Sequence, residues 1–183
     1  MRTKTSVFIA ASLDGLIARP DGSIDWLEQA NAVVPNGEDC GYGDFMASVD
    51  VLAMGRKTFE KVRTFDQWPY ADKKVIVLSG SPLVIPAELS GTVHASAEPP
   101  GRLVARLSAE GARHLYVDGG ITIQRFLAAG QIDDITITVI PILLGHGRPL
   151  FGPTPGDVKL LHVATRAFEF GFVQVKYQVV RSA

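Results

Sequence analysis

The sequence predicts an α/β fold built on a mixed, mostly parallel sheet that ends in a C-terminal antiparallel hairpin. Two observations indicate the parallel part: short apolar runs alternate with helical patterns, and twice an apolar run breaks on glycine and continues directly as a helical pattern. A third observation indicates the hairpin, because the last segment alternates apolar and polar residues with the period of a strand that has one solvated face. We therefore expect one three-layer α/β/α domain over residues 1–183.

The individual elements follow from the same patterns. The early strands are apolar on both faces, as expected when helices cover both sides of a mostly parallel sheet. Six strands are predicted before the hairpin, at residues 6–13, 51–54, 74–79, 92–95, 114–118 and 134–143. Helices are predicted at residues 42–48, 56–62, 101–110 and 121–129, and the last places Ile123, Phe126 and Leu127 on one buried side. The hairpin comprises residues 161–170 and 173–179, with a turn at Gly171.

Composition and charge exclude several classes of function. The chain has 183 residues, of which 46% are apolar and 20% charged, with a net charge of -1. That is enough to bury the core of a single domain. The 18 Lys and Arg are scattered among 19 Asp and Glu, so we expect no nucleic-acid partner. The four histidines are far apart in the sequence, and no metal site is expected.

The N-terminal apolar run and the cysteine content indicate a cytoplasmic protein. The run from Val7 to Leu13 is short, contains Ser12 and ends at Asp14, which favours a buried strand over a signal peptide or a membrane span. The single Cys40 excludes an internal disulfide and agrees with a reducing compartment. We therefore expect neither a membrane partner nor secretion.

The two glycine turns, at residues 50–58 and 114–122, are candidate anion sites. A helix start leaves unpaired N–H groups and a partial positive charge, and glycine lets a phosphate approach the backbone closely. On neighbouring strands, the two turns would hold one pyrophosphate from both sides. The structural alternative is that each glycine only begins the helix that follows its strand.

The residues after Gly55 favour NADPH over NADH. Arg56 and Lys57 follow this glycine, and no acidic residue follows where a ribose 2′-hydroxyl would be bound. Basic side chains at that position suit a 2′-phosphate. Neither turn has the G-x-G-x-x-G spacing, so an ordinary Rossmann domain is disfavoured.

Five short segments, in this order and spacing, resemble the dihydrofolate-reductase-like superfamily. They are Ser12-Leu13-Asp14-Gly15-Leu16-Ile17-Ala18, Asp25-Trp26, Met54-Gly55-Arg56-Lys57-Thr58-Phe59-Glu60, Val75-Ile76-Val77-Leu78-Ser79 and Asp118-Gly119-Gly120. The first segment and the run from Pro141 to Phe151 more closely resemble the riboflavin-biosynthesis reductase branch, which includes the C-terminal domain of the bifunctional deaminase-reductase RibD and stand-alone relatives. The resemblance covers nearly the whole chain and implies a dihydrofolate-reductase-like fold.

The resemblance implies where NADPH would bind. The nicotinamide would lie near the loop after the first strand, the pyrophosphate at the two helix starts, and the 2′-phosphate beside Arg56 and the end of the third strand. The cofactor-binding residues predicted on this basis are Ala10, Ile17, Ala18, Gly55, Arg56, Lys57, Thr58, Leu78, Ser79, Gly80, Ser81, Gly119, Gly120, Ile121 and Thr122.

The resemblance also suggests residues for substrate binding and catalysis. Trp26 and Phe45 are predicted to form an apolar wall of the site, and Thr138 matches a substrate-facing threonine of the reductases. In the riboflavin branch, the aspartate that Asp14 matches lies close to cofactor and substrate. Asp39 falls near the pterin-binding carboxylate of dihydrofolate reductases when the alignment is counted back from Met54. We predict Asp14 and Asp39 as catalytic residues.

Each of these residues also has a structural alternative. An Asp-Gly pair after a strand is a common turn, which would account for Asp14. Glu38, Asp39 and Asp44 would serve as caps of the next helix, and an alignment anchored on Phe45 places Gly41 or Tyr42 at the pterin-binding position instead. A buried threonine often bonds only to a neighbouring backbone group.

The expected function is NADPH-dependent reduction of a small heterocyclic, pyrimidine- or pterin-like substrate, similar to the 5-amino-6-(5-phosphoribosylamino)uracil reductase type. One alternative is a dihydrofolate reductase, and another is a nucleotide-binding module without catalysis. The resemblance further implies a homodimer, for which the C-terminal hairpin offers an edge.

Overall fold

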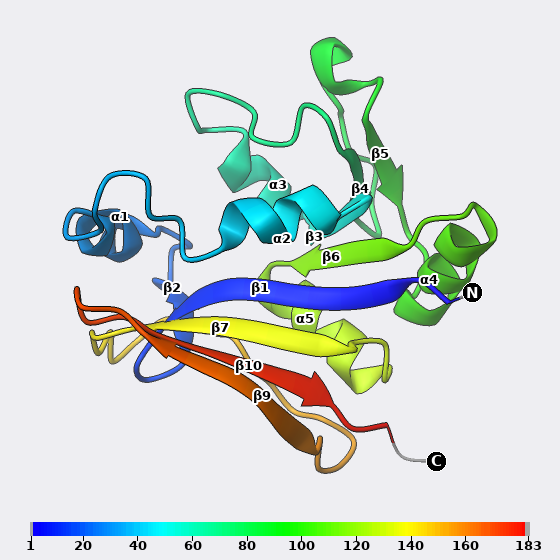
Figure 1. Cartoon of the computed structure of the whole chain (residues 1–183). Coiled ribbons are helices and arrows are strands. Elements are labelled where there is room, and N and C mark those ends of the chain that lie inside the picture. The colour runs from blue at the N-terminus through cyan, green and yellow to red at the C-terminus, as the bar shows by residue number, and fades with distance from the viewer. Residues whose placement is uncertain (1, 182–183) are drawn as a thin grey trace.

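The computed structural model describes residues 2–181 and contains an eight-stranded sheet. The strands are β1 (Lys4–Ser12), β3 (Val51–Gly55), β4 (Lys74–Leu78), β5 (Val93–Ser96), β6 (His114–Asp118), β7 (Asp134–Ile140), β9 (Leu160–Ala167) and β10 (Val173–Val179). Their order is β5-β4-β3-β6-β1-β7-β10-β9, parallel as far as β7 and antiparallel from β7 to β9 (Figure 1). The predicted mixed, mostly parallel sheet with a C-terminal hairpin is confirmed.

Helices on both sides of the sheet give the three layers. They are α1 (Asp25–Asn31), α2 (Tyr42–Ser48), α3 (Arg56–Val62), α4 (Pro100–Ala109) and α5 (Gly120–Ala128), with a short 3-10 turn, η1 (Ala87–Leu89). The core under α4 and α5 contains Leu103 and Phe126, and the core under α2 and α3 contains Phe59 and Tyr116. In Figure 1, α2 lies in front of the sheet and α5 behind it.

Alternation along the strands explains why both cores form. In β4, Val75 and Val77 lie in the core under α2 and α3, whereas Ile76 between them lies in the core under α4 and α5. A third apolar cluster, at the carboxyl end of β7, joins Trp26 of α1 to residues on both sides of the hairpin turn. Because the parallel strands all end at one edge of the sheet, loops from distant parts of the sequence meet there.

Several elements differ from the sequence prediction, and β9 ends at Ala167 rather than at residue 170. β7 ends at Ile140 because Pro141 has no N–H for the ladder. The helix α1 was not predicted, since Trp26 is its only buried residue and it shows no apolar face. β2 (Leu16–Ala18) and β8 (Arg148–Pro149) pair with each other and are too short to show a period.

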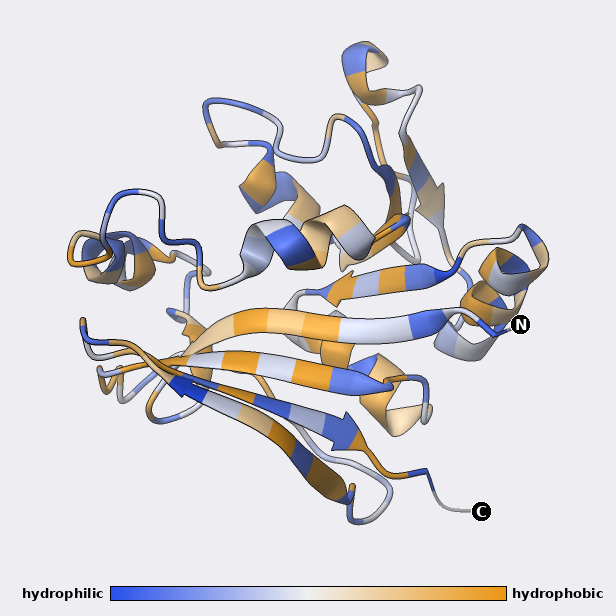
Figure 2. Ribbon diagram, in the orientation of Figure 1, coloured by the Kyte–Doolittle hydropathy of each residue, from blue (hydrophilic) through white to orange (hydrophobic). Residues whose placement is uncertain are grey.

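The hairpin is more exposed than its pattern indicated. Bands of hydrophobic and hydrophilic residues alternate along β7 and β10 (Figure 2). All eight residues of β9 are nevertheless exposed, so neither face of this strand is covered. β9 is the edge strand and pairs only with β10 in the described chain.

Between residues 2 and 181 there is no helix of the length and apolar character that crossing a membrane requires.

Candidate functional site

The predicted cofactor residues gather at the carboxyl edge of the parallel strands. Gly55 ends β3, Ser79 follows β4, and Gly119 follows β6. β3 pairs directly with β4 on one side and with β6 on the other. The two glycine turns therefore lie on neighbouring strands, which is the arrangement that a shared pyrophosphate site requires.

The two turns also interlock through their threonines. Gly119 has a φ of 89°, which favours glycine, and a Cβ at this position would overlap the Thr58 hydroxyl of the other turn. Conversely, Thr122 Oγ1 lies 2.9 Å from the position of a Cβ on Gly55. Each turn thus contributes one glycine and one threonine to a single contact between the starts of α3 and α5.

Gly120 has a packing role as well as the predicted role in phosphate binding. A Cβ there would lie 2.9 Å from Ile17 Cδ1 and 3.2 Å from the Pro149 carbonyl oxygen. Ile17 and Pro149 belong to the small β2-β8 sheet. The absence of a side chain at Gly120 therefore lets this sheet close over the start of α5.

Arg56 and the segment after β4 lie together, as the NADPH prediction requires. The guanidinium of Arg56 donates through Nη1 to Ser81 Oγ at 2.8 Å and through Nη2 to the Pro82 carbonyl at 2.6 Å. Ser79 Oγ donates to the Ser81 carbonyl at 2.7 Å. A guanidinium and serine hydroxyls at a partly exposed edge form a donor set that fits a phosphate group.

The other predicted cofactor residues surround the same edge. Ala10 near the end of β1, Ile17 in β2 and Leu78 at the end of β4 are half-buried, and Ala18 is buried. Ile121, in the first turn of α5, has 64% of its surface exposed. Lys57 and Gly80 are also exposed.

Asp14 holds two loops together. Its carboxylate accepts hydrogen bonds from Ser12 Oγ at 2.5 Å, from Gly145 N at 2.7 Å and from Leu144 N at 3.1 Å. The Ser12 bond, followed by the bond from Gly145, lowers the pKa of Asp14 below its usual value. Asp14 is therefore ionised at neutral pH and ties the turn after β1 to the 144–145 loop, which is suited to positioning rather than to proton donation.

Asp39 caps the start of α2. Its carboxylate accepts from Gly43 N and Gly41 N, each at 2.8 Å. These two bonds lower the pKa of Asp39. The structural alternative of helix capping is thus realised, and participation of Asp39 in catalysis stays a prediction.

Trp26 and Phe45 are packed into the apolar clusters that border the site. Trp26 is 1% exposed, and its Nε1 has no hydrogen-bond partner among the described residues. Phe45 stacks on Phe8 with 4.9 Å between ring centroids and meets Tyr116 edge to face at 5.1 Å. Phe45 therefore fixes α2 to the sheet.

Thr138 has a polar neighbour that the sequence did not reveal. Gln174 of β10 donates through Nε2 to Thr138 Oγ1 and to the Cys40 carbonyl, both at 2.9 Å. The regular alternation of β10 indicated a solvated position for Gln174, and no motif distinguished it from Lys176 or Gln178.

Asp118 is a second residue at this edge of the sheet that the sequence analysis did not single out. It ends β6 and lies on the same face of the sheet as Tyr116, two residues earlier, which belongs to the core under α2 and α3. Burial raises the pKa of Asp118 to about 6, and a hydrogen bond of 2.8 Å from Gly119 N opposes this rise only in part. The one signal in the sequence is an acidic residue at the end of a buried strand, directly before Gly-Gly.

Three tyrosines lie close enough to this carboxyl group for its charge to shift their pKa values. Burial raises the pKa of Tyr42, Tyr70 and Tyr116, and the charge of Asp118 contributes to each rise. All three hydroxyls therefore stay protonated at neutral pH. Of the described carboxyl groups with a resolved pKa shift, only Asp118 has a raised pKa, which places its titration nearest neutrality.

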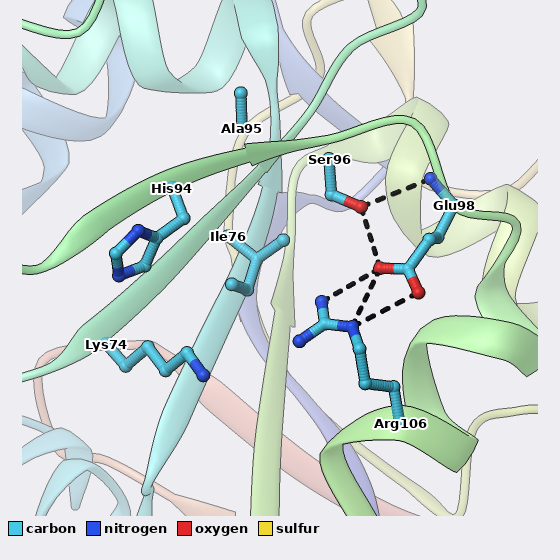
Figure 3. Close-up of a pocket in the computed structure, with 7 residues that line it drawn as sticks. All are labelled: Lys74, Ile76, His94, Ala95, Ser96, Glu98 and Arg106. Atoms are coloured by element: carbon cyan, nitrogen blue, oxygen red, sulfur yellow. Dashed lines mark hydrogen bonds and ion pairs between the residues drawn. The ribbon is translucent and has the colours of Figure 1, made fainter. Parts of the chain in front are cut away.

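A pocket of about 350 Å³ lies on the edge strand β5, away from these residues (Figure 3). Its cations are both neutralised: Arg106 pairs with Glu98 and Glu110, at 2.8 and 2.7 Å, and Lys74 pairs with Glu110 at 2.8 Å. Figure 3 shows the guanidinium of Arg106 facing the carboxylate of Glu98, which also accepts a hydrogen bond from Ser96 Oγ. This network attaches α4 to the sheet and leaves no unpaired charge for a ligand.

Known proteins share both the sequence and the fold. The chain is 39% identical over 171 residues to the uncharacterized protein YwjB of Bacillus subtilis, over 92% of this chain and 94% of that protein. A protein of Shewanella sp. PV-4 with the provisional name riboflavin biosynthesis protein is 39% identical and has a TM-score of 0.91, over 98% of this chain and 100% of that one.

A more distant structure shares the fold alone. The diaminohydroxyphosphoribosylaminopyrimidine deaminase/5-amino-6-(5-phosphoribosylamino)uracil reductase of Thermotoga maritima is 16% identical, with a TM-score of 0.71 over 98% of this chain and 57% of that longer chain.

The sequence model of the RibD C-terminal domain matches residues 3–173. With this match over nearly its whole length, and with relatives of 39% identity, the chain belongs to the RibD C-terminal domain family.

Proposed function

We propose that this protein is an NADPH-dependent reductase that acts on a small substrate with a flat heterocycle of the pyrimidine or pterin class. The observation that carries the proposal is the reciprocal contact of the Gly55 and Gly119 turns, which brings the starts of α3 and α5 together beside Arg56. Backbone N–H groups at helix starts bind phosphates, and a guanidinium strengthens such binding. When bound, NADPH supplies the hydride.

The names of similar proteins favour a pyrimidine substrate. The Thermotoga protein is named as a uracil reductase, and a Corynebacterium diphtheriae protein with 15% identity and a TM-score of 0.69 is named as pyrimidine reductase-like. Family membership supports the same class of reaction for this chain. A pterin carries a fused pyrimidine ring, so dihydrofolate is the natural second substrate to test.

Asp118 is our candidate for the proton source. Reduction of a C=N bond adds a hydride to carbon and a proton to nitrogen, and an acid with a pKa near the working pH is best suited to the second transfer. With a pKa of about 6, Asp118 meets this condition better than Asp14 or Asp39, whose pKa values are lowered. We assign Asp14 and Asp39 to the positioning of the loops that border the site.

The test is NADPH binding and oxidation by the purified protein. We expect NADPH to bind and to be oxidised in the presence of 5-amino-6-(5-phosphoribosylamino)uracil. If NADPH is oxidised with dihydrofolate but not with this pyrimidine, the protein is instead a dihydrofolate reductase. Binding without oxidation by any pyrimidine, pterin or flavin precursor would identify a binding module, and failure to bind NADPH would contradict the proposal.

Variants test the two carboxylate roles. Asp118→Asn should lower turnover by roughly 10²-fold or more and leave NADPH affinity unchanged, the usual range for loss of a general acid. If Asp14→Asn or Asp39→Asn has this effect and Asp118→Asn does not, the proton source is one of those residues.

We further propose that two copies associate through the hairpin. The edge strand β9 exposes Leu160 (43%), Leu161 (58%) and Val163 (51%), and such an apolar edge is suited to pairing with another strand. We expect light scattering to give the mass of a dimer, and Leu161→Lys with Val163→Lys to give a monomer. A monomeric parent protein would contradict this proposal.

A further inference from the structure

We infer that Thr138 and Gln174 together recognise the lactam edge of the substrate ring, the adjacent C=O and N–H groups that uracil and pterin share. The inference rests on the reductase function proposed above and specifies which part of the substrate these two side chains bind. Gln174 lies opposite Thr138 in the antiparallel register of β10 and β7, and Thr138 lies beside Ala10 of β1. Ala10 is the residue predicted to lie near the nicotinamide.

The Cys40 carbonyl fixes the orientation of the Gln174 amide. A backbone carbonyl only accepts hydrogen bonds, so the amide nitrogen of Gln174, 2.9 Å away, must point toward Cys40. The same nitrogen donates its second hydrogen to Thr138 Oγ1, also at 2.9 Å. Both amide hydrogens are used, and Oε1 is left as an acceptor without a partner among residues 2–181.

The Thr138 hydroxyl supplies the complementary donor. Because its oxygen accepts from Gln174, its own proton is available for donation, and no residue in the described part of the chain accepts it. Thr138 is only 6% exposed, so a donor here has little access to water. An unused buried donor is unfavourable, and a ligand that accepts from it removes this cost.

A hydroxyl donor beside an amide acceptor matches a ring carbonyl beside a ring N–H. The carbonyl oxygen would accept from Thr138, and the N–H would donate to Gln174 Oε1. A ring with an amino group in place of the carbonyl presents the opposite order, an N–H₂ donor beside a bare ring nitrogen acceptor. A mispaired polar group at this partly buried edge discriminates between such analogues.

The test compares two small ligands that differ in this edge. The probes are 5,6-diaminouracil, which has the lactam edge, and 2,4,5,6-tetraaminopyrimidine, which has amino groups instead. Binding to the full chain is measured by NMR titration at a pH where both probes are neutral, with and without NADPH. We expect the parent protein to bind the uracil at least about 10-fold more tightly.

Variants test whether Thr138 and Gln174 cause the preference for the uracil probe. Thr138→Val keeps the shape but removes the hydroxyl, and it should weaken uracil binding roughly 5- to 10-fold, the effect of one hydrogen bond, and reduce the preference. Thr138→Ser should retain the preference. Gln174→Met should reduce the preference, whereas Gln178→Ala, on the same face of β10 but opposite Asp134, should not.

The outcomes separate this inference from the reductase proposal. Equal binding of the two probes by the parent protein, or an unchanged preference in a folded Thr138→Val protein, would overturn the inference while NADPH binding still supports the reductase. Loss of the preference in the Gln178→Ala control would also overturn it. Failure of the parent to bind NADPH would contradict the reductase, and the ring preference would still be measurable without cofactor.

Discussion

The hydroxyl of Thr122 lies 2.9 Å from the position that a Cβ on Gly55 would take, although Gly55 ends β3 and Thr122 lies in the helix that follows β6. Thr58 and Gly119 stand in the same relation, with the roles of the two turns exchanged. The contact fixes the separation of the two helix starts in the absence of a ligand. Such preorganisation reduces the free energy that binding would otherwise spend on ordering the site.

The interlock predicts energetic coupling between Gly55 and Thr122. Gly55→Ala should lower the free energy of unfolding by about 1 to 3 kcal/mol, the usual effect of overpacking. Thr122→Ala in the same protein should recover at least about 0.5 kcal/mol relative to the sum of the single changes. Urea denaturation measures all four proteins. Gly91→Ala is the control, because a Cβ there meets no atom within 4 Å. If the changes in unfolding free energy from Gly55→Ala and Thr122→Ala simply add in the double variant, the two residues are not in contact.

Arg56 is predicted to select NADPH over NADH. Arg56→Ala should weaken NADPH binding by about 1.5 to 3 kcal/mol and leave NADH binding nearly unchanged, because only NADPH has the 2′-phosphate. Fluorescence titration measures both affinities. Arg113→Ala is the control, because it removes the same charge from a side chain that is 87% exposed. It should change neither the NADPH nor the NADH affinity. Equal losses for the two cofactors would rule out a 2′-phosphate contact at Arg56.

Asp118 is predicted to make the protein less stable as the pH rises from about 4 to 6. Its pKa is about 6 in the folded protein, against a usual value of 3.8, so within this range the folded state binds the proton more tightly than the unfolded state. The free energy of unfolding contributed by this group therefore falls with increasing pH. Asp118→Asn should remove the decline, and its stability relative to the parent should be higher at about pH 7.5 than at about pH 4.5. A difference independent of pH would contradict the raised pKa.

Arg106 is predicted to contribute to stability through its two glutamates. Arg106→Ala should lower the free energy of unfolding by about 1 kcal/mol at neutral pH, since the network is partly solvated, and by less at high salt. Arg106 is the largest cause of the lowered pKa of Glu98, so this stabilisation is present above about pH 4.5 and is lost as the pH falls through the lowered pKa. Denaturation at several pH and salt values measures the effect. An undiminished loss at low pH would mean that Arg106 acts by packing alone.

The fold was predictable because its elements have clear local patterns. β6, α2 and α3 begin or end within a residue of the predicted bounds, since each is a short apolar or amphipathic run bordered by glycine or by a change in polarity. The order β3-β6-β1-β7 is not visible in the sequence and was not predicted, because it depends on pairing between strands far apart along the chain. β2 and β8 escaped prediction because a pairing between residues 16–18 and 148–149 leaves no periodic signal in either segment.

The site was predictable only in part. The two glycine turns were visible in the sequence because each apolar run breaks on glycine before a helical pattern, and the resemblance suggested Ser81 beside Arg56; the structure brings the two turns into contact and joins Arg56 to Ser81 by a hydrogen bond, whereas their binding of a cofactor stays a prediction. Gln174 was not found, because its role depends on the cross-strand register with Thr138 and on a loop 134 residues away. Asp14 and Asp39 have lowered pKa values for the same kind of reason: the N–H groups that they bind are brought to them by the folded loops.

The central position of β1 has a consequence for synthesis of the protein. Ser6 of β1 bonds to His114, 108 residues later, and the other neighbour of β1, β7, follows later still. At about 5 to 20 residues per second, the ribosome needs roughly 5 to 20 s to deliver the first of these partners. Throughout that interval the apolar residues of β1 have neither of the strands that flank β1 in the sheet to pair with. We therefore expect this nascent chain to engage a chaperone that binds exposed apolar strands, and to fold only after β6 and β7 have emerged.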